Sequence, residues 1–139
     1  MPLPTSPKAY EHALRIAQAH STLEAYDALR KDPRFLFAND DKGRADALAE
    51  YTRLIDQAML RSQPLFVTLP KAKIEVRRVP EFKEKTASGA YYEAPALDNT
   101  RPGIFYSNLR DMNEVPMWSM PTLAYHEGVP GHHWQLSTA

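Results

Sequence analysis

The sequence contains no cysteine among its 139 residues. Disulfide bridges, thiolate metal sites and cysteine nucleophiles are therefore excluded. No apolar run approaches the roughly 20 residues that a membrane-spanning helix needs. The first residues show no basic segment followed by an apolar stretch, so we expect neither a membrane span nor a signal peptide. Cytoplasmic and exported locations both stay open.

The chain also lacks an excess of either charge, because 17 basic residues balance 17 acidic ones. This neutrality gives no electrostatic footprint for nucleic acid, and we expect no nucleic-acid partner. The proportions of hydrophobic residues (43%) and charged residues (24%) are those of a globular protein. The length suits one domain, and no repeat or linker divides it.

Residues 1–66 have the apolar periodicity of helices. A first helix is indicated by apolar residues at helical spacing: Tyr10, Ala13, Leu14 and Ala17. A second helix is predicted over residues 22–31, with Pro33 ending it. A third, longer helix follows the turn at residues 39–41. Its predicted inner face consists of Leu48, Tyr51, Thr52, Ile55 and Met59.

Residues 67–115 change to short extended segments separated by proline and glycine. Residues 74–78 alternate apolar and charged side chains before Pro80, which predicts an edge strand. Residues 90–93 and 103–109 are further strand candidates. Three short strands need a cover on one face, and the helices are the available cover. The predicted fold class is α+β: a mainly helical chain (1–139) with a small irregular sheet and a kinked motif helix over residues 116–139.

Three of the five histidines lie within eight residues, in the segment His126-Glu127-Gly128-Val129-Pro130-Gly131-His132-His133-Trp134-Gln135. The other two, His12 and His20, are predicted to be ordinary residues of the first helix. Neutral imidazole nitrogens bind zinc well, and a carboxylate beside them can act as a general base toward water. A His-Glu pair followed by a second histidine on a helix is typical of zinc metallopeptidases.

The spacing of this segment departs from the common zinc motif, in which histidines four residues apart are about 40° apart on a helix. Six residues separate His126 from His132, which puts them about 120° apart on an unbroken helix. Pro130 has no N–H for the carbonyl of His126, and its ring clashes with that carbonyl. We therefore predict a bulged or broken turn between Glu127 and His132 that brings His132 beside His126 and turns His133 elsewhere. From the spacing alone, a metal site and a structural kink with polar residues at its rim are equally supported.

The segment His-Glu-x-x-Pro-Gly-His-His-x-Gln resembles the signature of a bacterial family, number 885 among the domains of unknown function. Residues 75–80, 101–106 and 120–125 are similar to the central region of that family, both in their residue sequences and in their order along the chain. The resemblance covers roughly residues 23–139.

This resemblance implies that the chain is a fragment of a longer, largely helical protein grouped with zincin-like metallopeptidases. It implies that His126 and His132 are zinc ligands, that Glu127 is the general base and that a glutamate in a later segment is the third ligand. The parent would be a zinc-dependent hydrolase with a peptide-like substrate. Because a catalytic zinc needs three protein ligands, we expect the isolated chain to hold zinc weakly or not at all and to be inactive.

Four residues are candidates for supporting the ligands or binding substrate: His133, Gln135, Tyr106 and Tyr92. Residues 103–109 are also a candidate strand for pairing with an extended substrate. Four arginines could bind a substrate carboxylate: Arg77, Arg78, Arg101 and Arg110. Pairing with neighbouring glutamates such as Glu75 is the simpler expectation for them.

Two other functions stay open. The chain could be a non-catalytic helical module for binding or assembly, in which the motif serves only its kinked shape. It could also belong to a metal-dependent hydrolase of non-peptide bonds, because zinc polarises esters and amides alike. Exposed apolar surface at the end of the chain would favour self-association.

Overall fold

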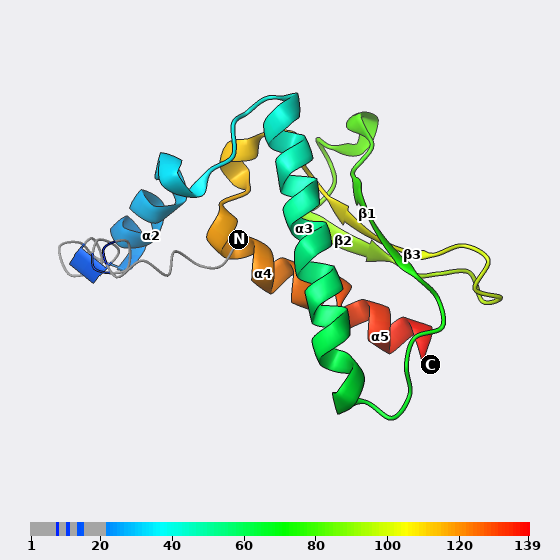
Figure 1. Cartoon of the computed structure of the whole chain (residues 1–139). Helices are drawn as coiled ribbons and strands as arrows, with labels where there is room; N and C mark the ends of the chain where they lie inside the picture. Colours follow the sequence, from blue (N-terminus) through cyan, green and yellow to red (C-terminus); the bar gives the residue numbers. More distant parts are fainter. Residues whose placement is uncertain (1–7, 9–10, 12–13, 16–21) are drawn as a thin grey trace.

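The computed structural model of the protein describes residues 8, 11, 14–15 and 22–139 (Figure 1). The helices are α2 (Thr22–Lys31), α3 (Asp41–Ser62), α4 (Met120–Leu123), the π-helical turn η6 (Ala124–Gly128) and α5 (Gly131–Ser137). The strands are β1 (Ile74–Arg78), β2 (Ala90–Glu93) and β3 (Gly103–Ser107). The predicted α+β class is confirmed. Apart from Leu14, the residues predicted to mark the first helix lie outside the described residues, as do His12 and His20.

Helix α3 covers the sheet because its inner face is apolar and its first turn is capped. The Asp40 side chain accepts a hydrogen bond from the Gly43 amide at 2.7 Å, which satisfies one of the free amides at the helix start. The buried apolar positions of the helix are Ala47, Tyr51, Leu54, Ile55 and Ala58. The prediction of Thr52 on this face is wrong: its side chain is exposed, and its hydroxyl donates to the Leu48 carbonyl at 2.8 Å.

The strand order in the sheet is β1-β3-β2, with β1 parallel and β2 antiparallel to β3. The prediction that residues 74–78 form an edge strand is confirmed. The strand predicted over residues 103–109 ends at Ser107 and is the central one. Because both of its edges are hydrogen-bonded to neighbouring strands, β3 has no edge to offer a peptide. The prediction that this strand pairs with substrate is therefore wrong.

The register of the sheet separates two faces. Phe105 lies between Val76 and Tyr92, and its ring packs 4.8 Å from that of Tyr51 on α3. These three strand residues therefore point toward the helices. Alternation along the strands places Tyr106, with Tyr91 stacked on it at 4.9 Å, on the opposite face. The helices cover one face of the sheet, as predicted.

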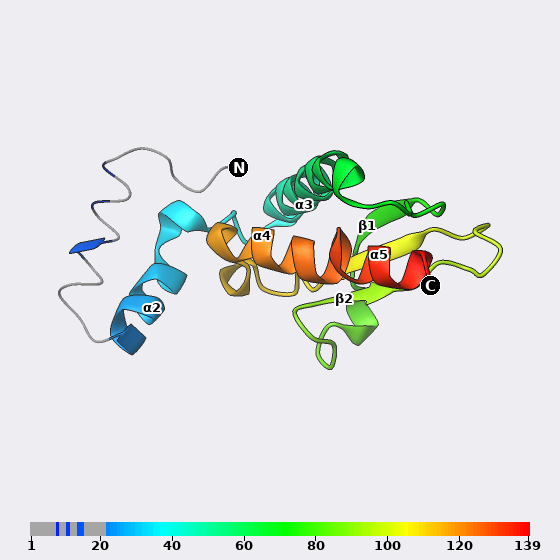
Figure 2. The ribbon, with the colours of Figure 1, turned by 90° about the horizontal axis from the view of Figure 1, so that it is seen from below.

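The segments α4, η6 and α5 follow one another as an interrupted rod beside α3 (Figures 1 and 2). Gly128 lets this rod approach α3 closely, because a Cβ atom there would lie 3.0 Å from Cδ1 of Ile55. Within the described part of the chain, no helix combines the length and the apolar character that a bilayer crossing requires. The predicted divisions at residues 66 and 115 stay predictions.

Candidate metal centre

The motif helix is interrupted between Glu127 and Gly131. The amide of Val129 donates to the carbonyl of Ala124, five residues back, at 3.0 Å, which is the bonding pattern of a π-helical turn. Val129 is extended (φ −122°, ψ 131°), and α5 begins two residues later. The Val129-Pro130 peptide bond is cis. The break predicted from Pro130 is present.

Gly131 closes this break by close backbone contact. A Cβ atom on Gly131 would overlap the carbonyl oxygen of His126 and lie 2.6 Å from that of Tyr125. Only glycine leaves room for the start of α5 to pack against the end of the preceding turn. The two parts of the motif therefore pack with their backbones in close contact.

His126, Glu127 and His132 converge across the break. One donor atom from each lies within 4.8 Å of the other two. The Glu127 carboxylate lies 3.5 Å from Nε2 of His132 and 3.9 Å from Nε2 of His126. The two imidazole rings are perpendicular, with centroids 5.2 Å apart. The break therefore brings together histidines that an unbroken helix would separate.

Gln135 orients the second of these histidines. Its Oε1 lies 2.9 Å from Nδ1 of His132. An amide oxygen only accepts, so Nδ1 of His132 carries the proton and donates it. The lone pair of His132 is then on Nε2, the nitrogen that faces Glu127. Metal-binding histidines commonly donate their other ring N–H in this way.

His133 points away from the cluster and is fully buried. Its Nε2 lies 3.1 Å from the Ala72 carbonyl and its Nδ1 2.6 Å from the Tyr92 hydroxyl. Burial lowers the pKa of His133, and the hydrogen bond to Ala72 opposes this shift. His133 and Tyr92 therefore meet on the sheet side of α5. Tyr106, on the opposite face of the sheet, is not brought to the motif.

The four arginines considered for carboxylate binding are all paired with glutamates. The pairs are Arg77 with Glu75, Arg78 with Glu84, Arg101 with Glu93, and Arg110 with Glu114. The simpler expectation from the sequence is confirmed for these residues.

Three contributors to the site are absent from the sequence prediction: the carbonyls of Thr68 and Ala72, and Gly103. The Thr68 carbonyl accepts a hydrogen bond from Trp134 Nε1 at 3.0 Å. Main-chain carbonyls carry no signal in a sequence. Gly103 did carry one, because a glycine at the start of an apolar strand indicates close approach by another group. Here that group is the Tyr92 hydroxyl, which a Cβ atom on Gly103 would overlap.

The donor set fits zinc. Imidazole nitrogens and carboxylate oxygens are among the ligands that zinc takes in proteins. The three side chains are also accessible, with exposed fractions of 69% for His126, 21% for Glu127 and 40% for His132. Two imidazoles alone leave a tetrahedral ion short of ligands.

A family model described as "Bacterial protein of unknown function (DUF885)" matches residues 8–139. The chain belongs to this family. The family suggested by the motif is thereby confirmed. A search of curated proteins found no match.

This DUF885 chain is also similar to a solved structure, described as "The crystal structure of the putative lipoprotein from Colwellia psychrerythraea". The TM-score is 0.81 at 34% sequence identity, over 92% of this chain. The match covers 24% of the other chain, so this chain spans about a quarter of the length of that relative.

Proposed function

We propose that this chain carries two zinc ligands, His126 and His132, and the general base, Glu127, of a hydrolase that acts on peptide bonds. The observation that carries the proposal is the convergence of three donor atoms within 4.8 Å across the broken helix. A structural kink does not require the two Nε2 atoms to face the same carboxylate. The family assignment itself supplies no activity.

Zinc, Glu127 and Gln135 have separate roles in the proposed reaction. Zinc, when bound, lowers the pKa of water and polarises a carbonyl. The Glu127 carboxylate accepts the proton of the attacking water and passes it to the leaving amine. Gln135 keeps the lone pair of His132 on Nε2.

A third ligand is needed for a catalytic zinc. Among the described residues, the group that could hold a metal is His126, Glu127 and His132. With Glu127 assigned as the general base, this group supplies two ligands. We place the third ligand in a part of the longer family fold outside this chain, which spans about a quarter of its solved relative. The chain by itself should then bind zinc weakly and lack hydrolytic activity.

Zinc titration of the chain tests the assignment of the ligands. We expect weak one-to-one binding that His126→Ala or His132→Ala removes, because each substitution deletes one of two imidazole donors. Glu127→Gln should retain most of the binding, because a general base is not a ligand. His12→Ala replaces a histidine outside the motif and serves as the control. Equal zinc binding by all variants would overturn the metal site.

The hydrolase assignment is tested in a longer family protein that contains this segment. There, Glu127→Gln should keep zinc and lower kcat on peptide substrates by about 10²-fold or more, since general bases typically contribute that much. Cleavage of ester substrates but not peptides would correct the class of bond. Unchanged partner binding without any cleavage would favour a non-catalytic module.

A further inference from the structure

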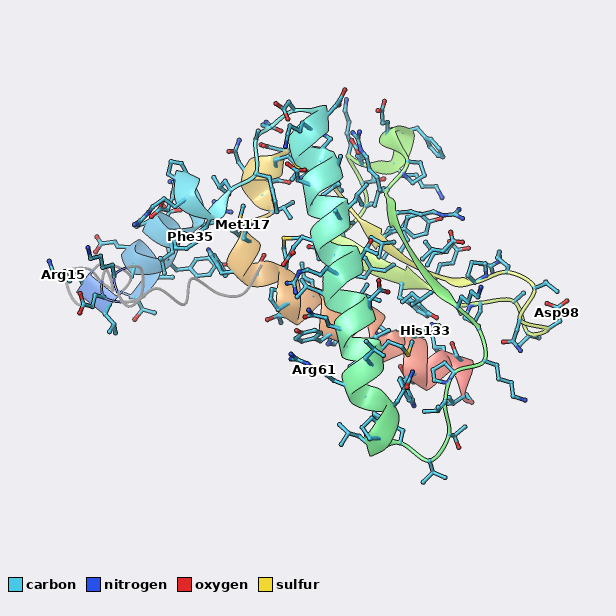
Figure 3. All side chains as sticks on the ribbon, viewed as in Figure 1. Arg15, Phe35, Arg61, Asp98, Met117 and His133 are labelled. Carbon is cyan, nitrogen blue, oxygen red and sulfur yellow. The ribbon has the colours of Figure 1, made fainter. Side chains whose placement is uncertain are left out.

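His133 lies next to a proposed zinc ligand, yet it makes its contacts on a different face of the helix. Its side chain is 0% exposed, between α5 and the strands (Figure 3). The Ala72 carbonyl can only accept a hydrogen bond, so Nε2 of His133 carries the proton. Nδ1 is then the acceptor, and the Tyr92 hydroxyl donates to it at 2.6 Å. The contacts fix both the tautomer and the orientation of the ring.

The sheet is built to admit this pair. A Cβ atom at Gly103, the first residue of β3, would overlap the Tyr92 hydroxyl and lie 2.9 Å from Nδ1 of His133. The amide of Gly103 donates to the Lys73 carbonyl at 2.9 Å, which holds the segment that contains Ala72. Residues from β2, from β3 and from the segment before β1 therefore surround one imidazole of α5.

Helix α5 needs contacts with other segments to fix its orientation, because it has only seven residues and follows a break. The hydrogen bond of His132 goes to Gln135, which belongs to the same helix and cannot fix the rotation of that helix. The bond from Trp134 to Thr68 and the two bonds of His133 link α5 to other segments. Neighbouring residues of a helix are about 100° apart, so fixing His133 also fixes the direction of His132.

We propose that His133, held by Tyr92 and Ala72, is a positioning residue that sets the rotation of α5 and thereby turns His132 toward His126 and Glu127. The proposal rests on the proposed function in assigning a metal to the cluster. It concerns the geometry of the cluster, which exists in the metal-free chain.

Tyr92→Phe is the sharpest variant for testing this proposal. It removes one hydroxyl and keeps the ring. Nδ1 of His133 retains the Ser137 hydroxyl as a partner at 3.3 Å, so no buried nitrogen is left unpaired. Since Ser137 belongs to α5, the hydrogen bond between α5 and β2 is lost, while the bonds of α5 to Ala72 and Thr68 remain. The control is Tyr91→Phe, the neighbouring tyrosine on the opposite face of the sheet.

Two measurements are made on each variant: nuclear Overhauser effects between the ring protons of His126 and His132 without metal, and cobalt(II) affinity by titration. In Tyr92→Phe we expect weaker ring-to-ring effects and about tenfold weaker cobalt binding, as for other residues that orient metal ligands. Tyr91→Phe should leave both unchanged. Urea unfolding confirms that each variant is folded.

Wild-type values of both quantities in Tyr92→Phe and in His133→Gln would overturn the positioning role. Failure of the proposed function has a different signature. The ring-to-ring effects would still respond to Tyr92→Phe, while His132→Ala and wild type would show the same cobalt binding.

Discussion

Tyr51 is the largest fully buried side chain among the described residues, and its ring packs on Phe105. Its hydroxyl and that of Ser107 are both buried, without the geometry of a hydrogen bond to any described residue. Burial raises the pKa of Tyr51 to about 12, and the nearby Ser107 hydroxyl opposes the shift. The folded protein therefore keeps a proton on Tyr51 at pH values where the unfolded chain releases it.

The free energy of unfolding should accordingly fall as the pH rises from 10, the ordinary pKa of tyrosine, toward 12. We expect wild type to lose about 1 kcal/mol per pH unit in this window relative to Tyr51→Phe, which cannot ionise. Urea unfolding at pH 9, 10 and 11 measures the difference. Tyr26→Phe, at a half-exposed tyrosine, is the control. Parallel pH profiles for wild type and Tyr51→Phe would contradict this account.

The motif rod depends on contact between two short elements, η6 and α5. Gly131→Ala should destabilise the chain by about 1–3 kcal/mol, because the added methyl group meets backbone that cannot move aside. It should also weaken zinc binding, because the start of α5 must shift away from His126. Gly89→Ala is the matched control, since a Cβ atom there meets nothing within 4 Å. Thermal unfolding and zinc titration of both variants measure the effect. Equal stability of the two would show that the contact at Gly131 does not hold the rod.

The elements show how far local sequence patterns determine this fold. Helix 22–31 and strand 90–93 have their predicted bounds, and the break follows from Pro130, because these features depend on neighbouring residues. Strand order was beyond prediction, because β3 pairs with residues about 30 positions earlier in the chain. The contacts of His133 were also beyond prediction, because the carbonyl that accepts its hydrogen bond lies 61 residues away in the chain. Thr52 was misplaced because helical periodicity cannot tell a packed threonine from one bonded to its own helix.

The molecule as described presents an apolar surface beside the candidate metal centre. It includes the exposed side chains Leu65, Phe66 and Tyr125, which line two hollows that share Pro130. Leu65 is 77% exposed. A hollow of about 560 Å³ lies between Phe66, Pro130 and Trp134. Contiguous apolar surfaces of this kind commonly mark sites of association.

We expect the chain to self-associate weakly through this surface, and sedimentation should show a molecular mass that rises with concentration. Leu65→Lys should shift the equilibrium toward monomer, because a charge is costly to bury without a partner. Leu97→Lys provides the control: Leu97 is even more exposed (105%) but lies in the turn between β2 and β3. A monomer at all concentrations, or equal effects of the two substitutions, would contradict the role of this surface.

The single extended residue at Val129 joins two independent helical pieces, and each piece carries one of the two imidazoles. The interval between them therefore tolerates no insertion or deletion. Removing one residue would turn the second piece by about a quarter of a revolution and carry its ring out of reach of the first. Substitutions in this stretch keep the number of residues between the two imidazoles, whereas any change of length alters the rotation of one piece relative to the other.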